Sequence, residues 1–100
     1  MIRFKVAQAA LEGISDILSY YGAPSSAADA FSDGFTDQVQ HLRQWPYTGH
    51  RRRDLTGTDV CFWQFDPYLI VFNIQDELLS VVAVLHSARN IRKILRKRLR

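Results

Sequence analysis

The sequence has little cysteine and no long hydrophobic run. Of its 100 residues only Cys61 is a cysteine, so no disulfide can form within the chain and a reducing compartment is expected. No apolar stretch approaches the roughly 18 residues that span a bilayer, and the first residues lack the apolar segment of a signal peptide. We therefore expect a cytoplasmic protein that makes no membrane contact.

Motifs of the common catalytic and cofactor-binding classes are also missing. The sequence contains no glycine-rich phosphate loop, no His-Glu metal-binding helix and no nucleophile elbow. His41 and His50 do not have the paired spacing of a metal site. We expect neither a metal nor an organic cofactor, so any activity should depend on ordinary side chains.

Acidic residues are absent from the last part of the chain. Residues 88–100 contain seven of the thirteen basic side chains and none of the ten acids, so this segment carries +7. Residues 1–87 hold six basic and ten acidic side chains and sum to −4. The net charge of +3 therefore conceals a strongly polarised molecule.

Hydrophobic composition and periodicity predict one domain, residues 1–100, that begins with a strand and two helices. Hydrophobic residues make up 47% of the chain, unlike a disordered sequence. Residues 2–6 alternate apolar and charged side chains, which is typical of an edge strand. Apolar residues then recur at helical spacing over 7–21 and 28–42. Ser26 with Asp29 resembles a capping box at the start of the second helix.

The second half of the chain predicts a sheet of four or five strands. Segments 52–56, 59–66 and 68–75 are separated by turn residues and are interpreted as strands, and the last two are rich in aromatic and β-branched residues. After a turn at Asp76-Glu77, residues 78–85 are almost continuously apolar, as in a central strand buried on both faces. The expected fold class is α+β, in the order β-α-α-β-β-β-α. An antiparallel sheet packs against an N-terminal helical hairpin, and a basic helix ends the chain.

The basic segment at the end of the chain predicts a narrow amphipathic helix. Ile91, Ile94, Leu95 and Leu99 form an apolar stripe. The side chains expected to point outward are all basic: Arg92, Lys93, Arg96, Lys97 and Arg100. Like charges along one helix repel each other, so an acidic partner would stabilise this surface. Alternatively, these cations only solubilise the helix end, where they suit the helix dipole.

Several short motifs follow one another in a known order along nearly the whole chain. They are Asp16-Ile17, Tyr20-Tyr21, Pro46, Gly49, Arg53-Asp54-Leu55, residues 68–72 and residues 84–91. Together they resemble the RelE/ParE superfamily of toxins from type II toxin-antitoxin systems. The resemblance implies a bacterial toxin that inhibits growth and is neutralised by a cognate antitoxin. RelE-like members cut mRNA on the ribosome, whereas ParE-like members act against DNA gyrase.

The junction between the last strand and the basic helix favours the ParE-like branch. His86 is followed by two small residues and then Arg89-Asn90, which resembles the ParE ending. RelE-like nucleases typically place a tyrosine beside this histidine or in the tail, but no tyrosine follows Tyr68. The segment 60–65 also lacks the arginine that these nucleases tend to present. The resemblance therefore implies a non-enzymatic inhibitor of a type II topoisomerase, DNA gyrase.

Two sets of candidate site residues follow from this resemblance. Contact with the target or the antitoxin is assigned to six residues: Arg53, His86, Arg89, Arg92, Lys93 and Arg96. In the alternative, a ribosome-dependent endoribonuclease, the site would consist of Arg51, Arg53, His86 and Arg89, which supply positive charge and one proton-transfer group. A third possibility is a relative that has lost toxicity and only binds its antitoxin.

Two of these candidates also have a purely structural interpretation. His86 could hold the junction together by a hydrogen bond to the backbone. Arg53 could form a solvated ion pair with Asp54, which would contribute about 0 to 1 kcal/mol. The aromatic residues of the predicted strands, including Trp63, are assigned to packing, because twelve aromatics in so small a domain must mostly be buried.

Overall fold

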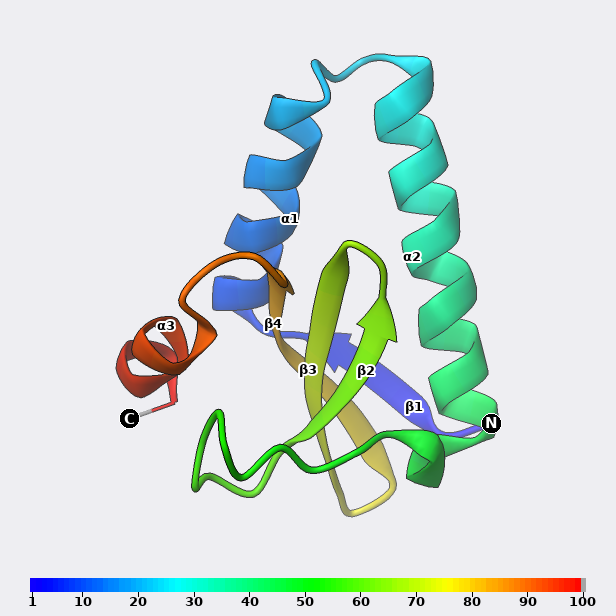
Figure 1. The fold of residues 1–100 in the computed structure, drawn as a ribbon. Helices are drawn as coiled ribbons and strands as arrows, with labels where there is room; N and C mark the ends of the chain where they lie inside the picture. Colours follow the sequence, from blue (N-terminus) through cyan, green and yellow to red (C-terminus); the bar gives the residue numbers. More distant parts are fainter. Residues whose placement is uncertain (100) are drawn as a thin grey trace.

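The structure, a computed structural model, describes residues 1–99 with three α-helices and four strands (Figure 1). In chain order the elements are β1 (Arg3–Val6), α1 (Gln8–Tyr20), α2 (Ser26–Gln44), the short 3-10 helix η1 (Pro46–Thr48), β2 (Cys61–Phe65), β3 (Tyr68–Gln75), β4 (Leu78–His86) and α3 (Ile91–Arg98). The predicted order β-α-α-β-β-β-α is confirmed, and the bounds agree within two residues. The predicted orientation of Arg100 falls outside the described residues.

The sheet has the strand order β1-β4-β3-β2, so β1 is an edge strand and β4 is central, as predicted. The pairs β2–β3 and β3–β4 are antiparallel, as predicted, but β1 and β4 are parallel, so the sheet is mixed and the prediction was wrong for β1. The hairpin of α1 and α2 returns the chain to the end at which β1 began, where the backbone N–H of Ile2 donates to Arg43 O at 3.2 Å. Strands β2 and β4 must therefore run in the same direction as β1.

The predicted strand over 52–56 was wrong. The backbone N–H groups of Leu55 and Thr56 both donate to Arg52 O, at 2.9 and 3.1 Å, which closes a turn in the middle of this segment. Within residues 51–60 the aromatic and β-branched content is too low to hold an extended pair. Sheet pairing is limited to an isolated bridge between His50 and Phe62. The segment is consequently a loop, and the sheet has four strands.

Helix α2 begins one residue earlier than its predicted capping box. Ser25, not Ser26, is the N-cap, and its hydroxyl oxygen accepts a hydrogen bond from the Ala28 backbone N–H at 3.1 Å. Asp29 is thereby shifted out of the position that a capping box requires and acts only as an acid in the first turn. Ser25 directly precedes Ser26 and can cap a helix equally well, so the predicted cap was one residue too late.

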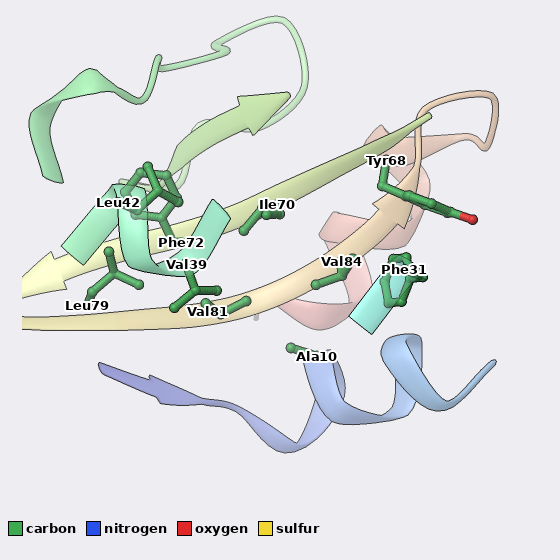
Figure 2. Packing of buried hydrophobic residues seen from close by; sticks show 10 residues of the cluster. All are labelled: Ala10, Phe31, Val39, Leu42, Tyr68, Ile70, Phe72, Leu79, Val81 and Val84. Atoms are coloured by element: carbon green, nitrogen blue, oxygen red, sulfur yellow. The ribbon is translucent and has the colours of Figure 1, made fainter. Parts of the chain in front are cut away.

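The sheet separates two hydrophobic layers. Helices α1 and α2 cover one face, where Figure 2 shows the side chains Ala10, Phe31, Val39, Leu42, Tyr68, Ile70, Phe72, Leu79, Val81 and Val84. Helix α3 and the end of the loop that precedes β2 cover the other face, where the buried residues are Val60, Phe62, Leu69, Val71, Ala83, Leu85, Ile91 and Leu95. Strand β4 contributes to both layers, which explains its almost continuous apolar sequence.

A β-bulge in β4 decides which way the end of this strand faces. Relative to β3, strand β4 carries one extra residue, Val82. Val81 lies in the layer with α1 and α2, and Val84 lies in the same layer although it is three residues later. Side chains alternate along a strand, so His86 lies on this face as well. Without the bulge His86 would lie on the α3 side.

Candidate functional site

Helix α3 holds its basic residues in a fixed orientation. Its N-terminus is capped by Asn90, whose side-chain oxygen accepts a hydrogen bond from the Lys93 backbone N–H at 3.2 Å. Ile91 and Leu95 are buried against the sheet, which fixes the rotation of the helix about its axis. Arg92, Lys93 and Arg96 are exposed, in agreement with the predicted apolar stripe.

A cleft of about 340 Å³ lies between α3 and the loop that precedes β2. We call it the basic cleft, because three arginine side chains line it: Arg53 from the loop and Arg92 and Arg96 from successive turns of α3. Its other lining residues are Asp54, Leu55, Thr56, Gly57, Thr58, Leu95 and Leu99. The structure thus brings three of the six predicted contact residues together, although Arg53 is about forty positions away from α3 in the sequence.

The predicted ion pair between Arg53 and Asp54 was wrong. Asp54 instead pairs with Arg52, whose Nε and Nη2 atoms donate to the two carboxylate oxygens at 3.0 and 2.8 Å. The hydrogen bond from Arg52 lowers the pKa of Asp54 and, in turn, raises the pKa of Arg52. The Arg53 guanidinium makes only a 3.5 Å contact with Gly57 O. In the described structure it therefore faces the basic cleft without a carboxylate partner.

The junction between β4 and α3 is a tight, hydrogen-bonded turn. His86 Nδ1 accepts a hydrogen bond from the Ala88 backbone N–H at 3.0 Å, and the Arg89 N–H donates to His86 O at 3.0 Å. Ser87 donates twice to Pro67 O, from its backbone N–H and its hydroxyl, both at 2.8 Å. The structural interpretation of His86 is confirmed: its ring holds the turn. With Nδ1 accepting, a neutral ring carries its proton on Nε2.

A second cleft, of about 540 Å³, lies between α1 and the end of β4. We call it the tyrosine cleft; its lining residues are Gly13, Asp16, Ile17, Tyr20, Tyr21, Pro67, Tyr68, Val84, Leu85, His86, Arg89 and Arg98. The rings of His86 and Tyr68 are nearly perpendicular, at 86°, with their centroids 5.5 Å apart. Arg98 crosses from α3 and donates to Ala9 O at 2.8 Å. The tyrosine cleft therefore holds two predicted site residues, His86 and Arg89.

Two of the tyrosines are joined by a hydrogen bond that sequence reasoning missed. The Tyr68 hydroxyl donates to the Tyr21 hydroxyl at 2.7 Å. Burial raises the pKa of Tyr68, and the contact with Tyr21 raises it further. The only signal in the sequence was the Tyr20-Tyr21 pair, and it does not show that a strand residue 47 positions later would meet it. Tyr20 itself is 84% exposed.

A comparison with protein families identifies the fold family. A family model described as the ParE toxin of type II toxin-antitoxin systems, parDE, matches residues 4–91. The chain belongs to the ParE toxin family. Membership implies a cognate antitoxin as a partner of this toxin. A search of curated proteins finds no match. The family match ends at the first residue of α3, so the roles of Arg92, Lys93 and Arg96 have to be argued from the geometry of this toxin.

The four residues of the nuclease alternative lie in three separate places in the toxin. His86 and Arg89 line the tyrosine cleft, whereas Arg53 lines the basic cleft. Arg51 forms an ion pair with Asp59 near the start of β2. Tyr68 on β3 pairs with His86 on one side and with Phe65 on the other, so His86 lies level with the last residue of β2. Arg51 lies near the first residue of β2, and the four residue steps from Cys61 to Phe65 span roughly 13 Å. Of the three arginines of that alternative, only Arg89 therefore lines the same cleft as His86.

Within residues 1–99, the toxin contains no helix with both the length and the apolar composition that a membrane span requires. No group of three or more His, Cys, Asp or Glu side chains is placed to hold a metal ion in this part of the chain. A third cleft, of about 310 Å³, lies between the two clefts described above and has Arg52, Arg89 and Arg92 among its lining residues.

The Tyr68 hydroxyl should make the stability of the toxin depend on pH. Its pKa is raised in the folded state, so the unfolded chain loses the phenolic proton first, near pH about 10. The contribution of Tyr68 to the free energy of unfolding should therefore be fully retained below about pH 10 and be lost above it. Tyr68→Phe should cost about 1 kcal/mol at neutral pH and weaken this alkaline loss.

Urea unfolding between about pH 8 and about pH 11 measures the effect. The matched control is Tyr47→Phe, because the Tyr47 side chain is 87% exposed. Equal alkaline loss of stability in the wild-type protein and in Tyr68→Phe would show that the Tyr68–Tyr21 pair does not carry the dependence.

Proposed function

We propose that this toxin inhibits DNA gyrase by protein-protein contact in the cytoplasm and is neutralised by its cognate antitoxin. Membership of the ParE family supports this proposal. The observation that carries it is the placement of the candidate residues. Arg53, Arg92 and Arg96 meet in one exposed cleft, whereas the residues that a nuclease would need are dispersed. Contact rather than RNA cleavage is the function that this arrangement serves best.

The basic cleft has the properties of a contact surface for a protein. Arginine is enriched among the residues that dominate binding energy at interfaces. Ile91 and Leu95 fix α3 on the sheet, so the backbone positions of Arg92 and Arg96 are set before binding and no helix has to be ordered in the complex. The surrounding positive charge, including Lys93, should speed the encounter with an acidic surface. His86 and Arg89 form a second contact region in the tyrosine cleft.

One observation favours the endoribonuclease as the second candidate. His86 and Arg89 line the same cleft. The turn uses only the Nδ1 atom of His86, so the Nε2 atom is available to a ligand. A ribosome-dependent nuclease could use such a histidine for proton transfer and such an arginine for the phosphate. The tyrosine cleft would then receive mRNA.

Two assays with the purified toxin separate these functions. The first follows supercoiling of relaxed plasmid by gyrase, and the second maps mRNA ends in a cell-free translation reaction. The proposal expects blocked supercoiling with intact mRNA. New mRNA ends that appear only when ribosomes translate would establish the nuclease and refute the proposal. If both reactions proceed normally and induced cells grow without the antitoxin, the chain is a non-toxic relative that only binds its antitoxin.

A further inference from the structure

The basic cleft contains more unpaired cationic side chains than one acidic side chain of a partner could neutralise. The described residues contain two ion pairs, Arg51–Asp59 and Arg52–Asp54, and neither involves the arginines of the cleft. Arg53 faces Arg92 and Arg96 across a space of about 340 Å³. We propose that this cleft binds backbone phosphates of duplex DNA.

Neutral groups beside the arginines also suit a phosphate. Thr56 and Thr58 line the same cleft. The Thr56 hydroxyl oxygen accepts a hydrogen bond from the Thr58 backbone N–H at 3.1 Å, so the hydroxyl hydrogen is still able to donate. Hydroxyl groups and guanidinium groups are common donors to phosphate oxygens in complexes with nucleic acids.

The one carboxylate in the lining of the basic cleft belongs to Asp54. Both of its oxygens accept hydrogen bonds from Arg52, which offsets much of its charge, and the charge of Arg92 also lowers its pKa. The arginine triplet of this loop is therefore divided. Arg51 and Arg52 are each paired with an aspartate, and Arg53 is left to face the cleft with its full charge.

The charge pattern along α3 favours a polymer with repeated anions over one acidic side chain. The exposed side chains Arg92, Lys93, Arg96 and Lys97 repeat along successive turns, and no acid follows Glu77 in the sequence. A single carboxylate takes one arginine in a bidentate pair and would leave the remaining cations to repel each other. The regularly spaced phosphates of a nucleic acid can neutralise several of them together.

The choice of duplex DNA over RNA rests on the proposed function, because gyrase acts on duplex DNA. The basic cleft would then lie where gyrase and its bound DNA meet, with phosphates contacting the cleft arginines and the enzyme contacting the surface around them. Such a contact is independent of DNA sequence, since phosphates position a protein without identifying bases. It should also weaken steeply with salt, because binding releases the counterions of the DNA.

The test is binding of the full chain to a fluorescent short duplex, followed by anisotropy from about 50 mM to about 200 mM salt. The wild-type protein should show a linear fall of log K with log salt concentration. Arg53→Ala and Arg92→Ala should each weaken binding to all sequences alike and reduce the slope by about 1. Lys5→Ala is the matched control, because Lys5 is an exposed cation on β1; affinity and slope should not change.

Several outcomes would overturn the proposal. The first two are an absence of salt-dependent binding and unchanged slopes in both arginine variants. The third is tighter binding to RNA of the same sequence than to the DNA duplex. The fourth is displacement of the labelled duplex by polyglutamate as effectively, per unit charge, as by unlabelled duplex. The unfolding midpoint of each variant is measured as well, to establish that the variant is folded. Gyrase is not present in this assay. Absent DNA binding with intact gyrase inhibition therefore refutes only the phosphate site, whereas DNA binding without gyrase inhibition refutes only the proposed function.

Discussion

Leu95→Ala is expected to lower the free energy of unfolding by about 2 to 5 kcal/mol. Leu95 is 0% exposed and belongs to the layer in which α3 packs against the sheet. The substitution removes part of that layer and leaves a cavity, because the rigid strands beneath it cannot collapse fully into the space. Urea or thermal unfolding measures the loss.

The control for this prediction makes the same chemical change at an exposed position. Leu11 lies on α1 and is 48% exposed, so Leu11→Ala should cost only about 1 kcal/mol. Similar losses for the two variants would mean that α3 is not packed on the sheet as described. Because Leu95 is buried, the basic residues of α3 should be tested by substitution; truncation before Leu95 would damage the core and the surface together.

Gly13→Val is the second large effect, with an expected loss of about 3 kcal/mol. A Cβ atom at Gly13 would lie 2.8 Å from the carbonyl oxygen of Val84, closer than real Cβ atoms approach other atoms. This neighbour is backbone in the central strand, so relief requires that α1 move away from β4. Gly34 is a useful contrast, because its Cβ would meet the far end of the Phe65 side chain, which can rotate.

The matched control for Gly13→Val is Gly57→Val. A Cβ at Gly57 would have no neighbour within 4 Å, so the free energy of unfolding of Gly57→Val should stay within about 0.5 kcal/mol of wild type. Gly13 also lines the tyrosine cleft, so a shift of α1 should change the environment of His86. Unchanged stability of Gly13→Val would contradict the close approach of α1 to β4.

Local periodicity predicted most elements of the fold because each buried face repeats at a fixed spacing. The apolar run over 78–85 correctly indicated a central strand, and the stripe of Ile91 and Leu95 correctly placed the basic residues of α3 on the outside. The direction of β1 relative to β4 could not be read in this way. It depends on how the helical hairpin returns the chain, which is a long-range property.

The candidate site was less predictable than the fold. The exposed positions of Arg92, Lys93 and Arg96 follow from the helical period. The meeting of Arg53 with α3 does not, because it depends on an irregular loop whose turn is closed by backbone hydrogen bonds from Leu55 and Thr56 to Arg52 O. Likewise, His86 faces the tyrosine cleft because of the bulge at Val82, for which the sequence gives no clear signal.

The most direct test of gyrase inhibition by contact is a supercoiling titration with two forms of the toxin. One is the wild-type protein, and the other is the double variant Arg92→Glu with Arg96→Glu, confirmed to have an unchanged unfolding midpoint. We predict that the wild-type protein blocks supercoiling and that the double variant needs at least about tenfold more protein for the same effect. Normal supercoiling in the presence of the wild-type protein, or equal inhibition by the two forms, would contradict the proposed role of α3.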